Sequence, residues 1–111
     1  MFEKDLTVGF LLDFYGDVLS DRKRTVLDYY YNDDLSLAEI AQEIGISRQG
    51  VRDLIKKAEE ELRFYEEKLG LAARFQNTQA SAQELLRLLE HAGIADEQIL
   101  STAKKLAETV R

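Results

Sequence analysis

The residues of this sequence best suited to chemistry with a partner are polar and basic side chains within residues 46–57. They are Ser47, Arg48, Gln49, Arg52, Lys56 and Lys57. Arg and Gln side chains form paired hydrogen bonds with guanine and adenine edges, and Arg and Lys neutralise phosphates. Arg48, Arg52 and Lys56 recur at every fourth position and therefore share one face of a helix. Four basic side chains against one acidic side chain give the segment a local charge of +3, which favours contact with a nucleic acid.

The helix that carries these side chains is predicted to be the second helix of a helix-turn-helix. Ser36 and Glu39 have the spacing of a capping box, which predicts a helix from Leu37 to Ile44. Gly45 suits the left-handed backbone that ends such a helix, and Ser47 suits the cap of the next one. The residues expected where the two helices cross are the small Ala41 and the aliphatic Ile40, Ile44, Ile46, Val51 and Leu54. In motifs of this kind the start of the second helix enters the major groove of DNA.

This second helix is predicted to continue to about Lys68, since no helix breaker follows Gly50 until Gly70 and the chain has no proline. Such a helix is about 30 Å long. Three short helices can cover only its first half, so its second half needs a partner. The candidates are the first amphipathic segment and a second copy of the chain.

The flanking segments are also predicted to be helical, which makes the fold all-α. A first helix is expected from about Asp5 to Leu19, and another from Asp21 to about Tyr31. The expected buried face of the first helix consists of Leu6, Phe10, Leu11, Phe14 and Val18. With the helix-turn-helix, they give a tri-helical domain extended by a long fourth helix, over residues 1–70.

Residues 71–111 are predicted to form a C-terminal αα-hairpin that serves packing or dimerisation. A weak helix or loop is expected around Ala72 to Gln79, followed by a helix that Ser81 caps and Gly93 ends. Asp96 is expected to cap the last helix. The narrow apolar seam of that helix consists of Ile99, Ala103, Leu106 and Val110. This hairpin is too small to stand alone, so we expect it to pack on the rest of the chain or on a twin.

Composition excludes most catalytic chemistry. The 111 residues include no Cys and one His, so a thiolate zinc site, a cysteine nucleophile and a histidine metal cluster are all excluded. We therefore expect no enzyme activity, no cofactor and no metal. The net charge of -6 disfavours a general nucleic-acid coat protein. No apolar run suits a membrane span or signal peptide, so a cytoplasmic protein is expected.

Two further clusters are predicted to be structural. The acidic runs Glu59–Glu61 and Glu66–Glu67 are interpreted as the solvated back of the long helix, paired with Arg63 and Lys68. Within Tyr29–Tyr31, helical phasing directs two of the three rings toward the core rather than toward a stacked base.

Several motifs of residues 6–70 together resemble the YlxM family. They are Phe14-Tyr15, Leu27-Asp28-Tyr29-Tyr30, the segments 33–41 and 45–59, and Tyr65-Glu66-Glu67-Lys68-Leu69. These small bacterial proteins have a helix-turn-helix like that of sigma-factor region 4, and they are encoded beside genes of the signal recognition particle. Arg52 stands where many relatives have an aromatic residue, which favours an electrostatic contact. The resemblance implies a regulatory, nucleic-acid-binding protein that takes part in the signal recognition particle pathway.

Two hypotheses about partners follow. In the first, the residues named at the start of the second helix bind duplex DNA or the RNA of the signal recognition particle, and the protein is a homodimer. In the second, the protein is an adaptor that binds no nucleic acid and modulates the GTPases of the particle through its acidic long helix.

Overall fold

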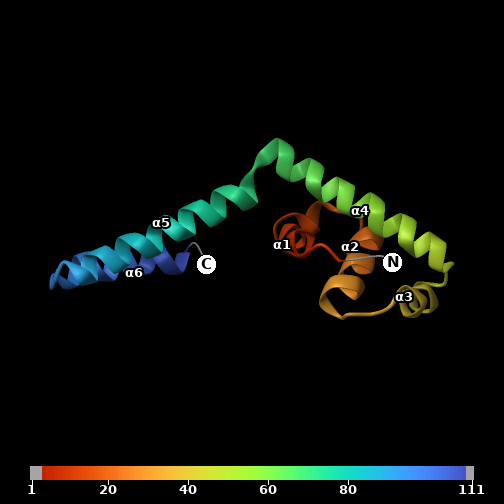
Figure 1. Ribbon diagram of the computed structural model, residues 1–111, viewed down its shortest axis with the longest axis horizontal. Coiled ribbons are helices and arrows are strands. Elements are labelled where there is room, and N and C mark those ends of the chain that lie inside the picture. The colour runs from red at the N-terminus through yellow and green to blue at the C-terminus, as the bar shows by residue number, and fades with distance from the viewer. Residues whose placement is uncertain (1–3, 110–111) are drawn as a thin grey trace. The chain divides into compact units, whose positions relative to one another are not determined.

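The computed structural model describes residues 4–109, which form helices and connecting turns with no strand (Figure 1). The predicted all-α helix-turn-helix fold is confirmed. The described residues up to Gly70 form one compact unit, and those from Leu71 onwards form a second. Each unit is described by itself below.

Helix α1, Leu6–Tyr15, begins at Asp5, whose carboxylate accepts a hydrogen bond from the Thr7 N–H at 2.9 Å. A short 3₁₀ turn, η1, Gly16–Val18, follows, so the helix ends four residues earlier than predicted. The buried residues of α1 are Val8, Leu11, Leu12 and Tyr15.

The predicted apolar face of the first helix is correct at Leu11, holds in part at the half-buried Phe10 and Phe14, and is wrong at Leu6 and Val18. Leu6 is 85% exposed and Val18 is 60% exposed. Apolar residues occur on nearly every side of this helix, so their spacing fits two different faces equally well. Which face is buried depends on the helices packed against it.

Helix α2, Asp21–Leu27, begins at Ser20, whose hydroxyl accepts a hydrogen bond from the Lys23 N–H at 3.3 Å. It continues into a single π-helical turn, η2, Asp28–Asn32. Its core residues are Val26, Leu27 and Tyr30.

The helix-turn-helix consists of α3, Leu37–Ile44, and α4, Arg48–Leu69. The predicted capping box at Ser36 and Glu39 is confirmed by reciprocal hydrogen bonds of 3.0 and 3.1 Å. Gly45 has a φ of +73°, a left-handed conformation that favours glycine because it has no Cβ, and it ends α3 as predicted.

Helix α4 runs through the whole first unit and supplies the centre of its core. Its fully buried residues are Val51, Ile55, Ala58 and Leu62. Helix α1 packs along α4: the Tyr15 and Tyr65 rings lie 5.9 Å apart, and the Tyr15 hydroxyl donates to Glu66 at 2.6 Å. The first amphipathic segment therefore covers the later turns of α4.

The second unit is a hairpin of α5, Leu71–His91, and α6, Glu97–Thr109. As predicted, Gly93 terminates the first helix of the hairpin: it lies just after α5 and has a φ of +71°. Asp96 caps α6, also as predicted, because its carboxylate accepts hydrogen bonds from the N–H groups of Gln98 and Ile99. The predicted break before Ser81 is wrong, because α5 continues through that residue. No Gly or Pro interrupts residues 71–92, and Ala and Gln are good helix formers there.

The buried residues of this hairpin are all alanines: Ala72, Ala82, Ala103 and Ala107. Val110 of the predicted seam lies outside the described residues. Between residues 4 and 109, no helix has the length and apolar character needed to cross a membrane.

Candidate nucleic-acid interface

The first turns of α4 present all six predicted contact residues on the surface. Ser47, Arg48, Gln49, Arg52, Lys56 and Lys57 are exposed. The Ser47 hydroxyl also has a structural role, since it accepts a hydrogen bond from the Gly50 N–H at 2.9 Å and so caps the helix.

A shallow depression lies where α3 and α4 begin. It has a volume of about 300 Å³ and is lined by Leu37, Arg48, Gln49 and Arg52. The first turn of α4 contains no acidic residue. The positive end of the helix dipole and the two arginines therefore act in the same direction, and both favour an anion.

The positive charge of Arg52 also acts on the buried Tyr30 of η2. Burial raises the pKa of the Tyr30 phenol, while the positive charges of Lys4 and Arg52 oppose that increase.

Gln49 and Asp53 form a hydrogen bond that was not predicted from the sequence. The Gln49 Nε2 donates to the Asp53 Oδ1 at 3.0 Å. Helical periodicity puts both residues on the side of α4 opposite Val51, Ile55 and Leu62. Their i, i+4 spacing could have suggested the pair.

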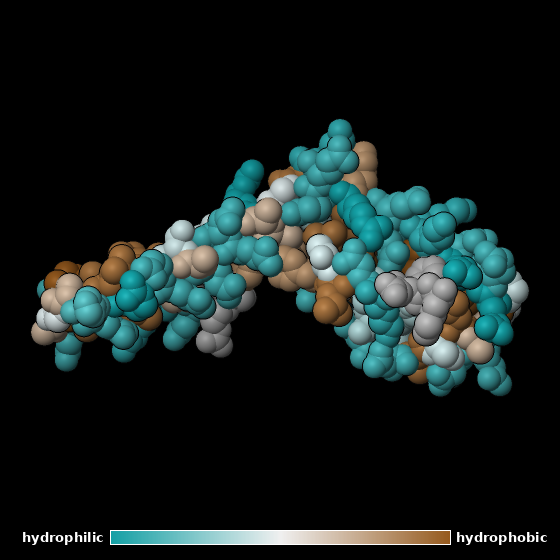
Figure 2. Space-filling view, viewed as in Figure 1, coloured by the Kyte–Doolittle hydropathy of each residue, from teal (hydrophilic) through white to brown (hydrophobic). Residues whose placement is uncertain are grey.

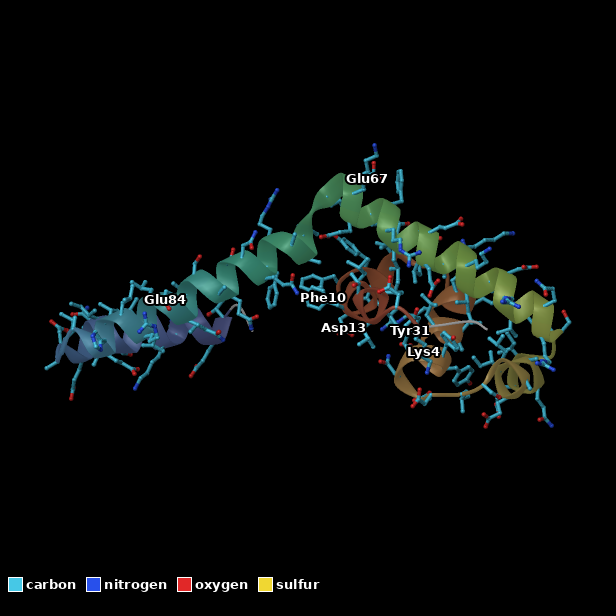
Figure 3. The ribbon with its side chains drawn as sticks, viewed as in Figure 1. Lys4, Phe10, Asp13, Tyr31, Glu67 and Glu84 are labelled. Atoms are coloured by element: carbon cyan, nitrogen blue, oxygen red, sulfur yellow. The ribbon has the colours of Figure 1, made fainter. Side chains whose placement is uncertain are left out.

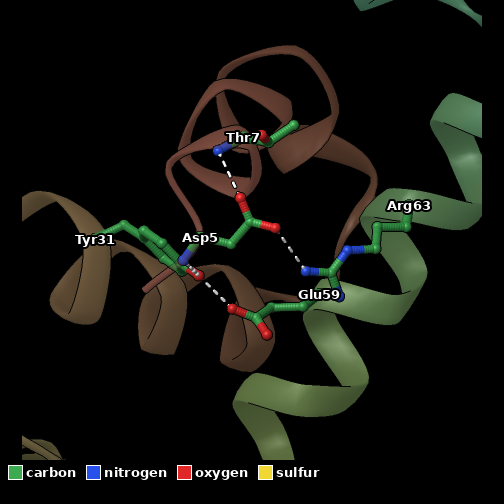
Figure 4. A network of polar contacts seen from close by, with 5 residues as sticks. All are labelled: Asp5, Thr7, Tyr31, Glu59 and Arg63. Carbon is green, nitrogen blue, oxygen red and sulfur yellow. Dashed lines mark hydrogen bonds and ion pairs between the residues drawn. The ribbon is translucent and has the colours of Figure 1, made fainter. Parts of the chain in front are cut away.

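The acidic residues of α4 are used differently from the prediction. Glu59 is only 8% exposed, and its carboxylate accepts a hydrogen bond from the Tyr31 hydroxyl (Figure 4). The same hydroxyl accepts one from the Asp5 N–H at 3.4 Å. Arg63, predicted to pair along α4, instead donates to Asp5 at 3.1 Å. This network joins α1, η2 and α4.

The pKa values of the network follow from its contacts. Burial, together with the hydrogen bond to Glu59, raises the pKa of Tyr31 well above its ordinary value. The Thr7 N–H, followed by the Arg63 guanidinium, lowers the pKa of Asp5.

Two more of the acidic residues predicted to be solvated are engaged within the first unit. Glu61 accepts hydrogen bonds from Lys23 and from the Tyr65 hydroxyl, each at 2.8 Å, and these bonds lower its pKa. Glu66 accepts the bond from Tyr15 described above. Of the five acids, Glu60 and Glu67 are exposed, and Glu67 extends outward from the last turns of α4 (Figure 3). The prediction of a solvated acidic back is therefore wrong at Glu59 and incomplete at Glu61 and Glu66.

The position of Glu59 could have been found from spacing. It lies four residues after Ile55 and three before Leu62, on the edge of the buried face. Its partner Tyr31 is 28 residues away, so the hydrogen bond itself has no local signal in the sequence.

Within residues 4–109, no group of three or more His, Cys, Asp and Glu side chains is arranged to hold a metal ion. The chemistry of this surface is therefore that of its basic and amide side chains.

Comparison with known proteins agrees with this architecture. Residues 2–106 match the family described as "Putative helix-turn-helix protein, YlxM / p13 like". A UPF0122 protein of Listeria welshimeri is 41% identical over 106 residues, which cover 96% of each chain. A UPF0122 protein of Bacillus cereus strain AH187 is 41% identical over 109 residues, which cover 96% of this chain and 99% of the relative.

Proposed function

This chain belongs to the YlxM- and p13-like helix-turn-helix family, and from that premise we propose that it is a cytoplasmic, non-enzymatic regulator that binds nucleic acid. The observation that carries the proposal is the exposed group of basic residues at the start of α4, the second helix of the motif. In helix-turn-helix proteins this end of the helix lies in the major groove. Arg48, Gln49 and Arg52 are the proposed contacts to bases and adjoining phosphates, and Lys56 and Lys57 extend the phosphate contact.

The nucleic acid we propose is duplex DNA or the RNA of the signal recognition particle. The resemblance to proteins encoded beside that particle's genes supports the second target, and the helix-turn-helix geometry supports the first. In either case the charge of the chain restricts the contact. A local charge of +3 on a chain of net charge -6 permits few phosphate contacts, all at the start of α4.

The adaptor hypothesis has less support. It requires an acidic surface along α4, yet Glu59 is buried and Glu61 and Glu66 are hydrogen-bonded within the first unit. Binding of the particle's GTPases from nuclease-treated lysate, with no affinity for nucleic acid, is the result that favours the adaptor instead.

A binding titration at two salt concentrations tests the proposed function. The full chain is titrated with duplex DNA and with the particle's RNA at 0.05 M and 0.2 M salt. Three or four phosphate contacts predict a loss of affinity of about 40- to 150-fold between these concentrations for DNA. Absence of binding to both nucleic acids at the lower salt concentration contradicts the proposal.

The hairpin supports a second proposal, that the protein is a homodimer. Leu85, Leu88, Ile99 and Leu106 remain 42–48% exposed, and Figure 2 shows apolar residues gathered over the end of the hairpin where α5 and α6 meet. Residues 70–111 contain five basic and five acidic side chains, so two copies of this unit carry no net repulsion. A dimer doubles the phosphate contacts and presents two recognition helices.

Light scattering tests the dimer. The wild-type chain is expected to have twice the 12.7 kDa mass of one chain. The double variant Leu88→Glu/Ile99→Glu is expected to have the monomer mass, because it introduces charges into the proposed apolar interface. The matched control Gln76→Glu/Gln83→Glu changes exposed polar residues of α5 and should remain dimeric. A monomeric wild-type protein contradicts the dimer but not nucleic-acid binding.

A further inference from the structure

The hydrogen bond between Gln49 and Asp53 determines how the Gln49 amide is oriented. The Asp53 carboxylate can only accept hydrogen bonds, so the amide must direct its nitrogen toward Asp53, at 3.0 Å, and its oxygen away. Both residues are exposed. The Gln49 amide is therefore exposed, and its hydrogen bond with Asp53 fixes its orientation.

The oriented amide retains one N–H and its carbonyl oxygen for a partner. A donor and an acceptor side by side match adenine in the major groove, which presents the N7 acceptor beside the N6 donor. Gln bound in this way to adenine distinguishes it from the other bases by about 5- to 150-fold.

The charges around the pair indicate what it faces. Arg48, Arg52 and Lys56 flank it on one side of α4, and Lys57 lies on the other side. Phosphates repel the carboxylate of Asp53, whereas the amino groups on the edges of the nucleobases can donate hydrogen bonds to it. In the favoured orientation, Gln49 and Asp53 face the floor of the groove. The flanking Arg and Lys side chains then face the phosphates of the two strands.

We propose that Gln49 reads an adenine in the major groove of duplex DNA and that Asp53 is the positioning residue that orients its amide. This inference rests on the proposed function and commits it to DNA, since side chains cannot read the deep, narrow major groove of A-form RNA.

Selection from a pool of duplex DNA with random sequence tests the inference. The full wild-type chain is expected to enrich an adenine at one position of the bound site. Gln49→Ala should lose this preference while its affinity for unselected duplex stays within about threefold, because the phosphate contacts remain.

Variants of Asp53 separate its charge from its hydrogen bond. Asp53→Ala is expected to weaken the adenine preference by up to about twofold, the worth of one i, i+4 pair, and to raise affinity for unselected duplex by removing a negative charge. Asp53→Asn also removes the charge but keeps an acceptor, so it should retain more of the preference. Glu60→Ala is the matched control, because it removes an exposed acid of α4 without touching Gln49.

The outcomes distinguish this inference from the proposed function. If Gln49→Ala leaves the adenine enriched, or if Asp53→Ala leaves the degree of adenine enrichment unchanged, the inference is overturned while nucleic-acid binding stands. If the protein binds the RNA but no duplex DNA, the inference is likewise overturned. If the wild-type chain binds neither nucleic acid, both fail.

Discussion

Reversing the charge at Arg48, Arg52 and Lys56 together, each to Glu, is expected to abolish nucleic-acid binding. The triple variant replaces three attractive contacts with three repulsive ones, so affinity should fall by more than about a hundredfold at 0.1 M salt. Any residual binding should depend little on salt concentration, because the counterions released by these contacts are no longer involved. The measurement is a titration with duplex DNA and the particle's RNA at two salt concentrations.

The control must have the same net charge as the triple variant. Arg22→Glu/Lys68→Glu/Arg74→Glu changes three exposed basic residues away from the start of α4 and is expected to bind nearly as well as the wild type. Thermal melts of both variants establish that they are folded, which matters because Arg52 lies near Tyr30. Equal affinity of the first triple variant and the wild type refutes the interface at the start of α4.

Charge reversal at Glu59 is expected to destabilise the first unit severely, whereas the same change at Glu60 is not. Glu59→Lys removes the acceptor of the Tyr31 hydroxyl and buries a cation one helical turn from Arg63. The loss of unfolding free energy is expected to be about 3 kcal/mol or more. Glu60→Lys, on the exposed side, should change it by less than about 0.5 kcal/mol. Urea unfolding followed by circular dichroism measures both values.

The difference between Glu59 and Glu60 also limits which variants can test the adaptor hypothesis. A loss of protein binding after reversal of Glu59 reports unfolding rather than a lost contact, so only Glu60 and Glu67 are suitable for that test. Unfolding midpoints for Glu59→Lys and Glu60→Lys that agree within error contradict the buried network.

The helix-turn-helix could be predicted from the sequence because its signals are local. Ser36 with Glu39, Gly45 and Ser47 each act through backbone groups within a few residues, so their spacing predicts the start and end of each helix. The exposure of Arg48 and Lys56 follows from the same register. The boundaries of α3 and the start of α4 agree with the structure for this reason.

The features that could not be predicted depend on contacts across the fold. Leu6 and Val8 are equally apolar, yet only Val8 is buried, because packing against other helices selects the face of α1. Ser81 has the chemistry of a cap, but the alanines around it allow α5 to continue. The burial of Glu59 depends on Tyr31, a residue of another helical segment.

The continuity of α4 has a consequence for how binding can be detected. One uninterrupted helix carries the exposed bases in its first turns and the buried network with Tyr31 further along. A small compact unit of this kind is expected to unfold as a whole. A ligand bound by the basic residues therefore also stabilises the buried network against unfolding. By mass action, a nucleic acid present at a hundred times its Kd raises the unfolding free energy by about 2.7 kcal/mol. The phenol of Tyr31, which is outside the set of proposed contact residues, then becomes a reporter of occupancy through the melting temperature it shares with the interface.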